Sequence, residues 1–150
     1  MKTVFDPQCR NELVARIALL NPSHQPLWGK MNLYQMLKHN TYWNLWMLGQ
    51  GHFKYRQEFL GKVFGKIALR RMVKNSKPLD KNVPTSPQFK VQAIEGNLEA
   101  EKKQWVRLIH AYEHYNNPDF VHDFFGKMHL EDIGILVYKH SDHHLRQFQA

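Results

Sequence analysis

Apolar residues recur at intervals of three and four in five stretches of the chain, and this spacing is typical of amphipathic helices. The predicted helices cover residues 6–20, 32–48, 55–73, 87–115 and 129–148. Their ends carry helix signals, such as Asp6 before Pro7 at the first and Asn32 with Gln35 in capping-box spacing at the second. No stretch alternates apolar and polar residues strongly enough to predict a strand. The pattern therefore predicts an all-α fold.

The lengths of the connections predict how these helices are arranged. The connection from the first to the second helix is short, so those two should run antiparallel. More than thirty residues separate the second helix from the helix at 87–115, which is enough for a crossover that leaves them parallel, and the link at 116–128 reverses the direction again. We expect an up-down-down-up four-helix bundle, with an extra basic amphipathic helix at 55–73 in the crossover between its second and third helices. The whole chain, residues 1–150, is expected to form this single domain.

The composition excludes several classes of protein. The chain is 43% hydrophobic and 13% aromatic, which excludes an intrinsically disordered protein. Its one cysteine, Cys9, excludes a disulfide framework and a cysteine-based zinc cluster, and it fits a small core residue better than a nucleophile. There is no apolar run long enough to span a membrane and no apolar secretory segment near the N-terminus. We expect a soluble, cytoplasmic protein.

Positive charge is concentrated in one segment of the sequence. The net charge is +8, and the segment 54–81 holds nine Lys and Arg residues but only two acidic residues. A solvated basic face is the favoured interpretation, because the aromatic side chains of this segment fall partly on the predicted core side of its helix. The alternative is a surface that binds nucleic acid or an anionic membrane, and the sequence leaves that alternative open.

The chain contains ten histidines, and their helical phase separates them into two kinds. His140 and His144, four residues apart, fall in the middle of the apolar stripe of the last predicted helix. His39 falls on the apolar side of the second helix. His110 and His114 have the same spacing but lie opposite the apolar stripe of their helix, so we expect that pair to be exposed.

Three imidazoles from two helices are therefore expected to converge in the interior. His39, His140 and His144 could hold zinc or a related divalent ion, since catalytic sites often combine three protein ligands with one open position. The alternative is that they are core histidines hydrogen-bonded to Tyr, Glu or backbone groups. The spacing HxxxH has low specificity, and the protease motif H-E-x-x-H is absent.

Three segments of the sequence are similar to a known superfamily. They are Leu33–His39, His122–Met128 and Tyr138–Phe148, and together they resemble the DinB-like (YfiT-like) superfamily, most closely a branch of unassigned function. Helix order extends the resemblance over most of the chain. His129 stands where this branch usually has a hydroxyl N-cap, and the basic helix at 55–73 matches nothing in the superfamily pattern.

The resemblance implies a four-helix bundle with a divalent metal held by three histidines, which match His39, His140 and His144. Some superfamily members are thiol-dependent S-transferases, isomerases or hydrolases, and others have no known reaction. Homodimers are frequent among them. We expect zinc or nickel as the metal.

Glu101 is the one charged residue on the apolar stripe of the helix predicted at 87–115. Because it lies near the level of His39 and His140, we expect it to orient a ligand imidazole or to act as a general base. The alternative is a stripe-edge glutamate paired with Lys102 or Arg107.

Two functions follow from these features. One is a metal-dependent transferase or hydrolase acting on a small molecule. The other is a non-catalytic, metal-stabilised module that binds nucleic acid or an anionic surface through residues 54–81.

The last predicted helix also carries apolar residues away from its histidine stripe. Ile135, Tyr138 and Leu145 fall on its outward face, where they need a cover. The basic segment or a second subunit could supply that cover. We expect a homodimer with this helix at or near the interface.

Overall fold

Local sequence signals set the ends of the first two helices. In the computed structural model, which describes residues 1–150, the Asp6 side chain accepts a hydrogen bond from the backbone N–H of Gln8 at the start of the first helix. Asn32 and Gln35 form the predicted capping box at the start of the second, and Gly49 ends that helix at a positive φ of 70°. These predicted helix ends are therefore confirmed.

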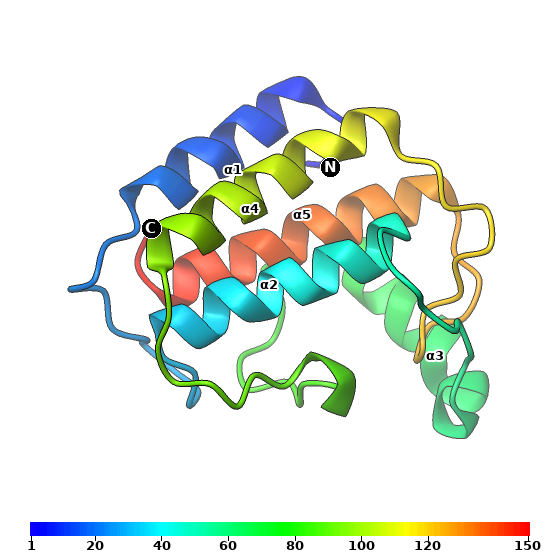
Figure 1. Cartoon of the computed structure of the whole chain (residues 1–150). Coiled ribbons are helices and arrows are strands. Elements are labelled where there is room, and N and C mark those ends of the chain that lie inside the picture. The colour runs from blue at the N-terminus through cyan, green and yellow to red at the C-terminus, as the bar shows by residue number, and fades with distance from the viewer.

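The protein is entirely helical, with five α-helices and no strand (Figure 1). The α-helices are α1 (Pro7–Leu19), α2 (Leu33–Leu48), α3 (Phe59–Val73), α4 (Leu98–Ala111) and α5 (Leu130–Gln147), and the two short 3-10 helices are η1 (Pro87–Phe89) and η2 (Tyr112–His114). None of these helices combines the length and apolar character needed to cross a bilayer.

Four of the helices lie side by side around one core (Figure 1). α4 contacts both α1 and α2, and α5 also contacts both α1 and α2, so each helix touches two others of the four. Large side chains fill the space between them, and Trp46, Trp105, Tyr112 and Phe148 are almost completely buried. Cys9 is buried as well, as predicted for a core residue. α3 packs against α5 outside this group.

The prediction of one helix over residues 87–115 is wrong for the first third of this range. Pro87–Phe89 forms only one 3-10 turn, residues 90–97 are not helical, and α4 begins at Leu98. Val91 and Ile94, which continue the apolar spacing of α4 in the sequence, therefore do not belong to its apolar stripe.

Contacts with α2 explain why residues 90–97 are not helical. The Asn32 side chain donates to the Ile94 carbonyl at 2.7 Å, and the Gln35 side chain donates to the Val91 carbonyl at 3.2 Å. These carbonyls are satisfied by distant side chains instead of by the next helical turn. Asn97 then caps α4 by accepting a hydrogen bond from the N–H of Ala100.

α3 begins four residues later than predicted and packs through glycine. Glu58 is the residue before the helix, and its backbone N–H donates to the Asp123 carbonyl at 2.7 Å. Gly61 and Gly65 lie directly against the backbone of Phe124, and a Cβ atom at either position would overlap its carbonyl oxygen. The two glycines therefore permit the close approach of α3 to the link before α5.

The outward face of α5 is covered within the chain. Ile135, Tyr138 and Leu145 are all buried, because α1 packs on one side of α5 and α3 on another. The Tyr138 hydroxyl donates to Glu12 of α1 at 2.9 Å. The apolar residues that led us to expect a second subunit at this helix therefore have a cover without one.

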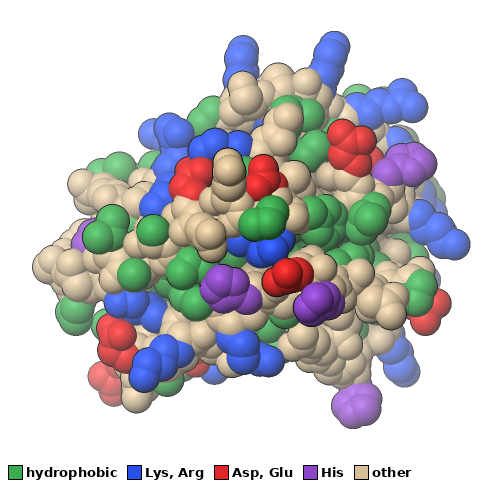
Figure 2. Space-filling view, turned by 90° about the horizontal axis from the view of Figure 1, so that it is seen from above, with side chains coloured by type: hydrophobic (Ala, Val, Ile, Leu, Met, Phe, Trp, Pro, Cys, Tyr) green, Lys and Arg blue, Asp and Glu red, His purple; other side chains and the backbone are tan.

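The surface on the α1 side mixes charges of both signs. Figure 2 shows acidic, basic and histidine side chains interspersed with small apolar areas on this face.

His110 on α4 and His114 on η2 are exposed, as predicted from their helical phase.

Candidate metal centre

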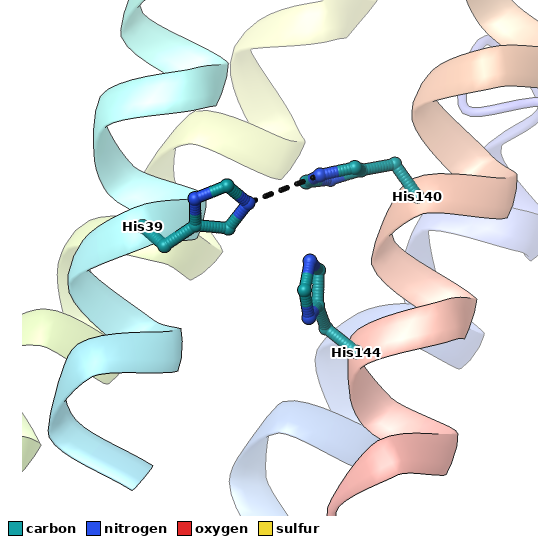
Figure 3. Close-up of side chains that lie close together, drawn as sticks. All are labelled: His39, His140 and His144. Atoms are coloured by element: carbon teal, nitrogen blue, oxygen red, sulfur yellow. Dashed lines mark hydrogen bonds between the residues drawn. The ribbon is translucent and has the colours of Figure 1, made fainter. Parts of the chain in front are cut away.

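Three histidines converge between α2 and α5. His39 lies near the middle of α2, and His140 and His144 lie on consecutive turns of α5. Figure 3 shows their rings pointing toward one another across the space between the two helices. His39 and His144 are 4% and 6% exposed, which places the cluster in the interior.

The nitrogens of these rings are close enough to share one ion. One ligand nitrogen from each of the three residues lies within 4.8 Å of the others, and the Nε2 atoms of His39 and His140 are 3.3 Å apart. Two nitrogens bound to one tetrahedral zinc lie about 3.3 Å apart, given a Zn–N bond of about 2.0–2.1 Å. The cluster therefore fits a divalent ion with small side-chain movements.

Hydrogen bonds on the outer sides of two rings set their tautomers. His39 Nδ1 donates to the Phe89 carbonyl at 3.1 Å, and His144 Nδ1 donates to the Gln147 side-chain oxygen at 2.9 Å. The amide of Gln147 is itself oriented, because its nitrogen donates to the Trp28 carbonyl at 2.7 Å. Because a carbonyl oxygen can only accept, the hydrogen of each of these two rings lies on Nδ1. The Nε2 atoms of His39 and His144 therefore carry lone pairs that face the interior.

His140 is held by stacking rather than by an outer hydrogen bond. Its ring stacks on Trp43 with centroids 4.0 Å apart and planes inclined by 13°. Its buried Nδ1 has no hydrogen-bond partner. Its Nε2 donates to the lone pair of His39 Nε2 when no cation lies between them.

Burial keeps the three imidazoles neutral. It lowers the pKa of His39, and burial together with the neighbouring imidazoles lowers the pKa of His140 and His144 well below the ordinary value. Neutral rings at pH 7 offer lone pairs without competition from protons.

Glu101 does not contact this cluster through a hydrogen bond. Its carboxylate accepts from Lys38 at 2.7 Å and from Thr41 at 3.0 Å, both on α2. Glu101 therefore does not orient an imidazole, contrary to expectation. The rings of His39 and His144 are oriented by the Phe89 carbonyl and by Gln147. Pairing with Lys102 or Arg107 is also not observed, because these side chains bond to other groups.

The sequence could predict one of the groups that orient the histidines but not the other. Gln147 lies three residues after His144 on the same helix face, and this spacing predicts contact between the two side chains. The Phe89 carbonyl left no signal, since a backbone group has no side-chain signature and the segment was predicted as helix. His122 is buried, and its Nδ1 accepts hydrogen bonds from the backbone N–H groups of Phe124 and Phe125.

Fold and site together define an all-helical protein with three convergent, neutral imidazoles that could hold a metal ion. A family model described as "Protein of unknown function (DUF1569)" matches residues 7–150, so the chain belongs to this family. Comparisons with curated proteins and with solved structures gave no match.

Proposed function

We propose that this protein is a DinB-like metalloprotein in which His39, His140 and His144 hold one zinc or nickel ion. The bound ion serves thiol S-transfer or hydrolysis of a small molecule. The observation that supports this proposal is the convergence of three buried imidazole nitrogens within 4.8 Å. The lone pairs of His39 and His144 are directed inward, because hydrogen bonds to the Phe89 carbonyl and to Gln147 hold the opposite nitrogens of these two rings.

The arrangement of the helices supports the same assignment. The contacts of α4 and α5 with both α1 and α2 are those of a four-helix bundle. We infer that α3 forms the crossover between α2 and α4, and that the four other helices run in the up-down-down-up order. A site built from facing helices inside a bundle is a common place for metals.

The donor set suits an ion that activates a substrate. Three imidazoles leave a coordination position for a small molecule, and neutral ligands leave the full charge of the ion in place. A divalent ion bound there would polarise a substrate carbonyl or lower the pKa of bound water or thiol. The chain's own residues orient the ligands, with Phe89 and Gln147 holding two rings and Trp43 stacking on the third.

Metal content of the protein, purified without a histidine tag, tests the proposal. We expect close to one divalent ion per chain by elemental analysis, and zinc or nickel uptake with that stoichiometry after chelator treatment. No bound metal and no uptake would overturn it.

The reaction is tested by a panel of thiol-transfer and ester substrates with metal-loaded and metal-free protein. Turnover independent of the metal, or no turnover on any substrate, would contradict the catalytic part.

A further inference from the structure

α3 presents an apolar strip to the solvent. Its large apolar side chains are more than half exposed, with exposed fractions of 78% for Phe59, 61% for Leu60, 54% for Val63, 55% for Phe64 and 69% for Ile67. Soluble proteins rarely leave apolar side chains contiguous on one helix face without a partner. This set of five residues is called the α3 strip below.

The packing of α3 against the rest of the protein holds the α3 strip on the solvent side of the helix. The buried residues of α3 are Gly61, Gly65 and Leu69, which lie on the opposite side of the helix from Val63 and Ile67. The glycines approach the backbone of the link before α5 too closely for any larger side chain. The helix therefore cannot rotate to bury its strip without losing this contact.

A buried lysine of α5 anchors the other end of α3. The Lys139 ammonium donates to the carbonyls of Met72 at 2.6 Å, Asn75 at 2.5 Å and Lys77 at 2.9 Å. These carbonyls belong to the last turn of α3 and to the residues after it, where helical partners are missing. Both ends of the helix are thus held in place, and the strip is a preformed surface.

The same exposed surface is strongly cationic. Lys62, Lys66, Arg70, Arg71 and Lys74 are all exposed, and α3 contains no acidic residue. Figure 1 places α3 at the edge of the molecule, inclined to the other helices, where a large partner could reach it. The partner must therefore accept apolar side chains and cations together.

We propose that α3 docks on the surface of an anionic lipid bilayer. The α3 strip enters the boundary between headgroups and acyl chains, and the lysines and arginines beside it contact lipid phosphates. A second copy of the chain would bring like charges together at this face. Nucleic acid would neutralise the cations but leave the apolar strip without a partner, since its affinity comes mainly from phosphate contacts.

Vesicle co-sedimentation tests the docking. We expect the protein to bind vesicles of phosphatidylcholine with about one third phosphatidylglycerol, to bind pure phosphatidylcholine far more weakly, and to be released partly by salt. Equal binding to both vesicles, or none to either, would overturn the proposal. Repeating the measurement with chelator separates this surface from the metal site, and binding should be unchanged.

Paired variants separate the apolar and the charged contributions. The variant Phe64→Ser/Ile67→Ser should weaken binding to anionic vesicles at least about tenfold. Its control is Ile94→Ser, which alters a side chain that is also 69% exposed but lies outside α3. The variant Arg70→Glu/Arg71→Glu should also weaken binding at least about tenfold.

The control for charge is Lys103→Glu/Arg107→Glu, which makes the same change in net charge on exposed positions of α4. All these variants alter exposed side chains, and unchanged thermal unfolding by circular dichroism verifies their folds. If either control weakens binding as much as its α3 counterpart, the surface is assigned wrongly.

Two further measurements exclude the other partners. A dimer by light scattering that Phe64→Ser/Ile67→Ser converts to a monomer would show that a second copy covers the strip. Retention on duplex DNA that depends on Arg70 and Arg71 but not on the strip would show a nucleic-acid surface. Either result, together with weak vesicle binding, would overturn the membrane assignment.

Discussion

Two pairs of histidines share a spacing of four residues but have different surroundings. His140 and His144 face His39 in the interior, whereas His110 and His114 are exposed. Replacing His144 with Ala should lower metal affinity by more than about 100-fold, because it removes a ligand and not merely the partner of a ligand. Isothermal titration with zinc and nickel measures this change.

His114→Ala is the matched control for that substitution. It changes an exposed side chain, so the free energy of unfolding should move by no more than about 0.5 kcal/mol and metal affinity should stay the same. Parental affinity in both variants would show that the three-histidine assignment is wrong.

The buried imidazoles also predict a dependence of stability on pH. In the metal-free protein the pKa values of His39, His140, His143 and His144 are lowered, mainly by burial. Below the ordinary histidine pKa of about 6.5, the unfolded chain binds more protons than the folded protein. The free energy of unfolding should therefore be highest above that pH and fall as the pH is lowered from about 7.5 to 5.5.

Urea unfolding at a series of pH values measures this loss. The variant His140→Gln should show a shallower dependence, since it removes one of the groups that the unfolded chain protonates. A free energy that is constant over the range in the parent protein would contradict neutral, buried imidazoles.

At the scale of the helices, α3 depends on glycine where alanine would be the better helix former. Ala in place of Gly65 should favour the helix by about 1 kcal/mol, but its Cβ would overlap the carbonyl of Phe124. Because such overpacking costs about 1–3 kcal/mol, we expect Gly65→Ala to give a net loss of stability. Thermal and chemical unfolding measure it. Val63→Ala, on the exposed side of α3, should be nearly neutral, and equal effects in the two variants would contradict the packing described here.

For the whole molecule, metal binding should be linked to unfolding. An ion at 100 times its dissociation constant stabilises the folded state by about 2.7 kcal/mol, which corresponds to a shift in Tm of roughly 5–10 °C for a protein of this size. Calorimetry with zinc and then with excess chelator measures the shift. His39→Ala should abolish it. A shift that persists in this variant would place the metal elsewhere in the protein.

The sequence by itself predicted the features that depend on short-range interactions. The five helices, the caps at Asp6 and Asn32, and the contrast between buried and exposed histidine pairs all follow from spacing within one helix. The phase of α2 and α5 also selected the three histidines that the structure brings together. The resemblance selected the same residues.

Only the tertiary structure decided the features that depend on distant segments. Residues 90–97 leave the predicted helix because the side chains of Asn32 and Gln35, at the start of α2, donate to their carbonyls. Glu101 bonds to α2 rather than to an imidazole. The Phe89 carbonyl orients His39, and α1 and α3 cover the outward face of α5. Each of these outcomes joins residues far apart in the chain through a specific hydrogen bond or packing contact. Periodicity reports which face of a helix is buried, but the partner on that face is chosen by the packing of the whole chain.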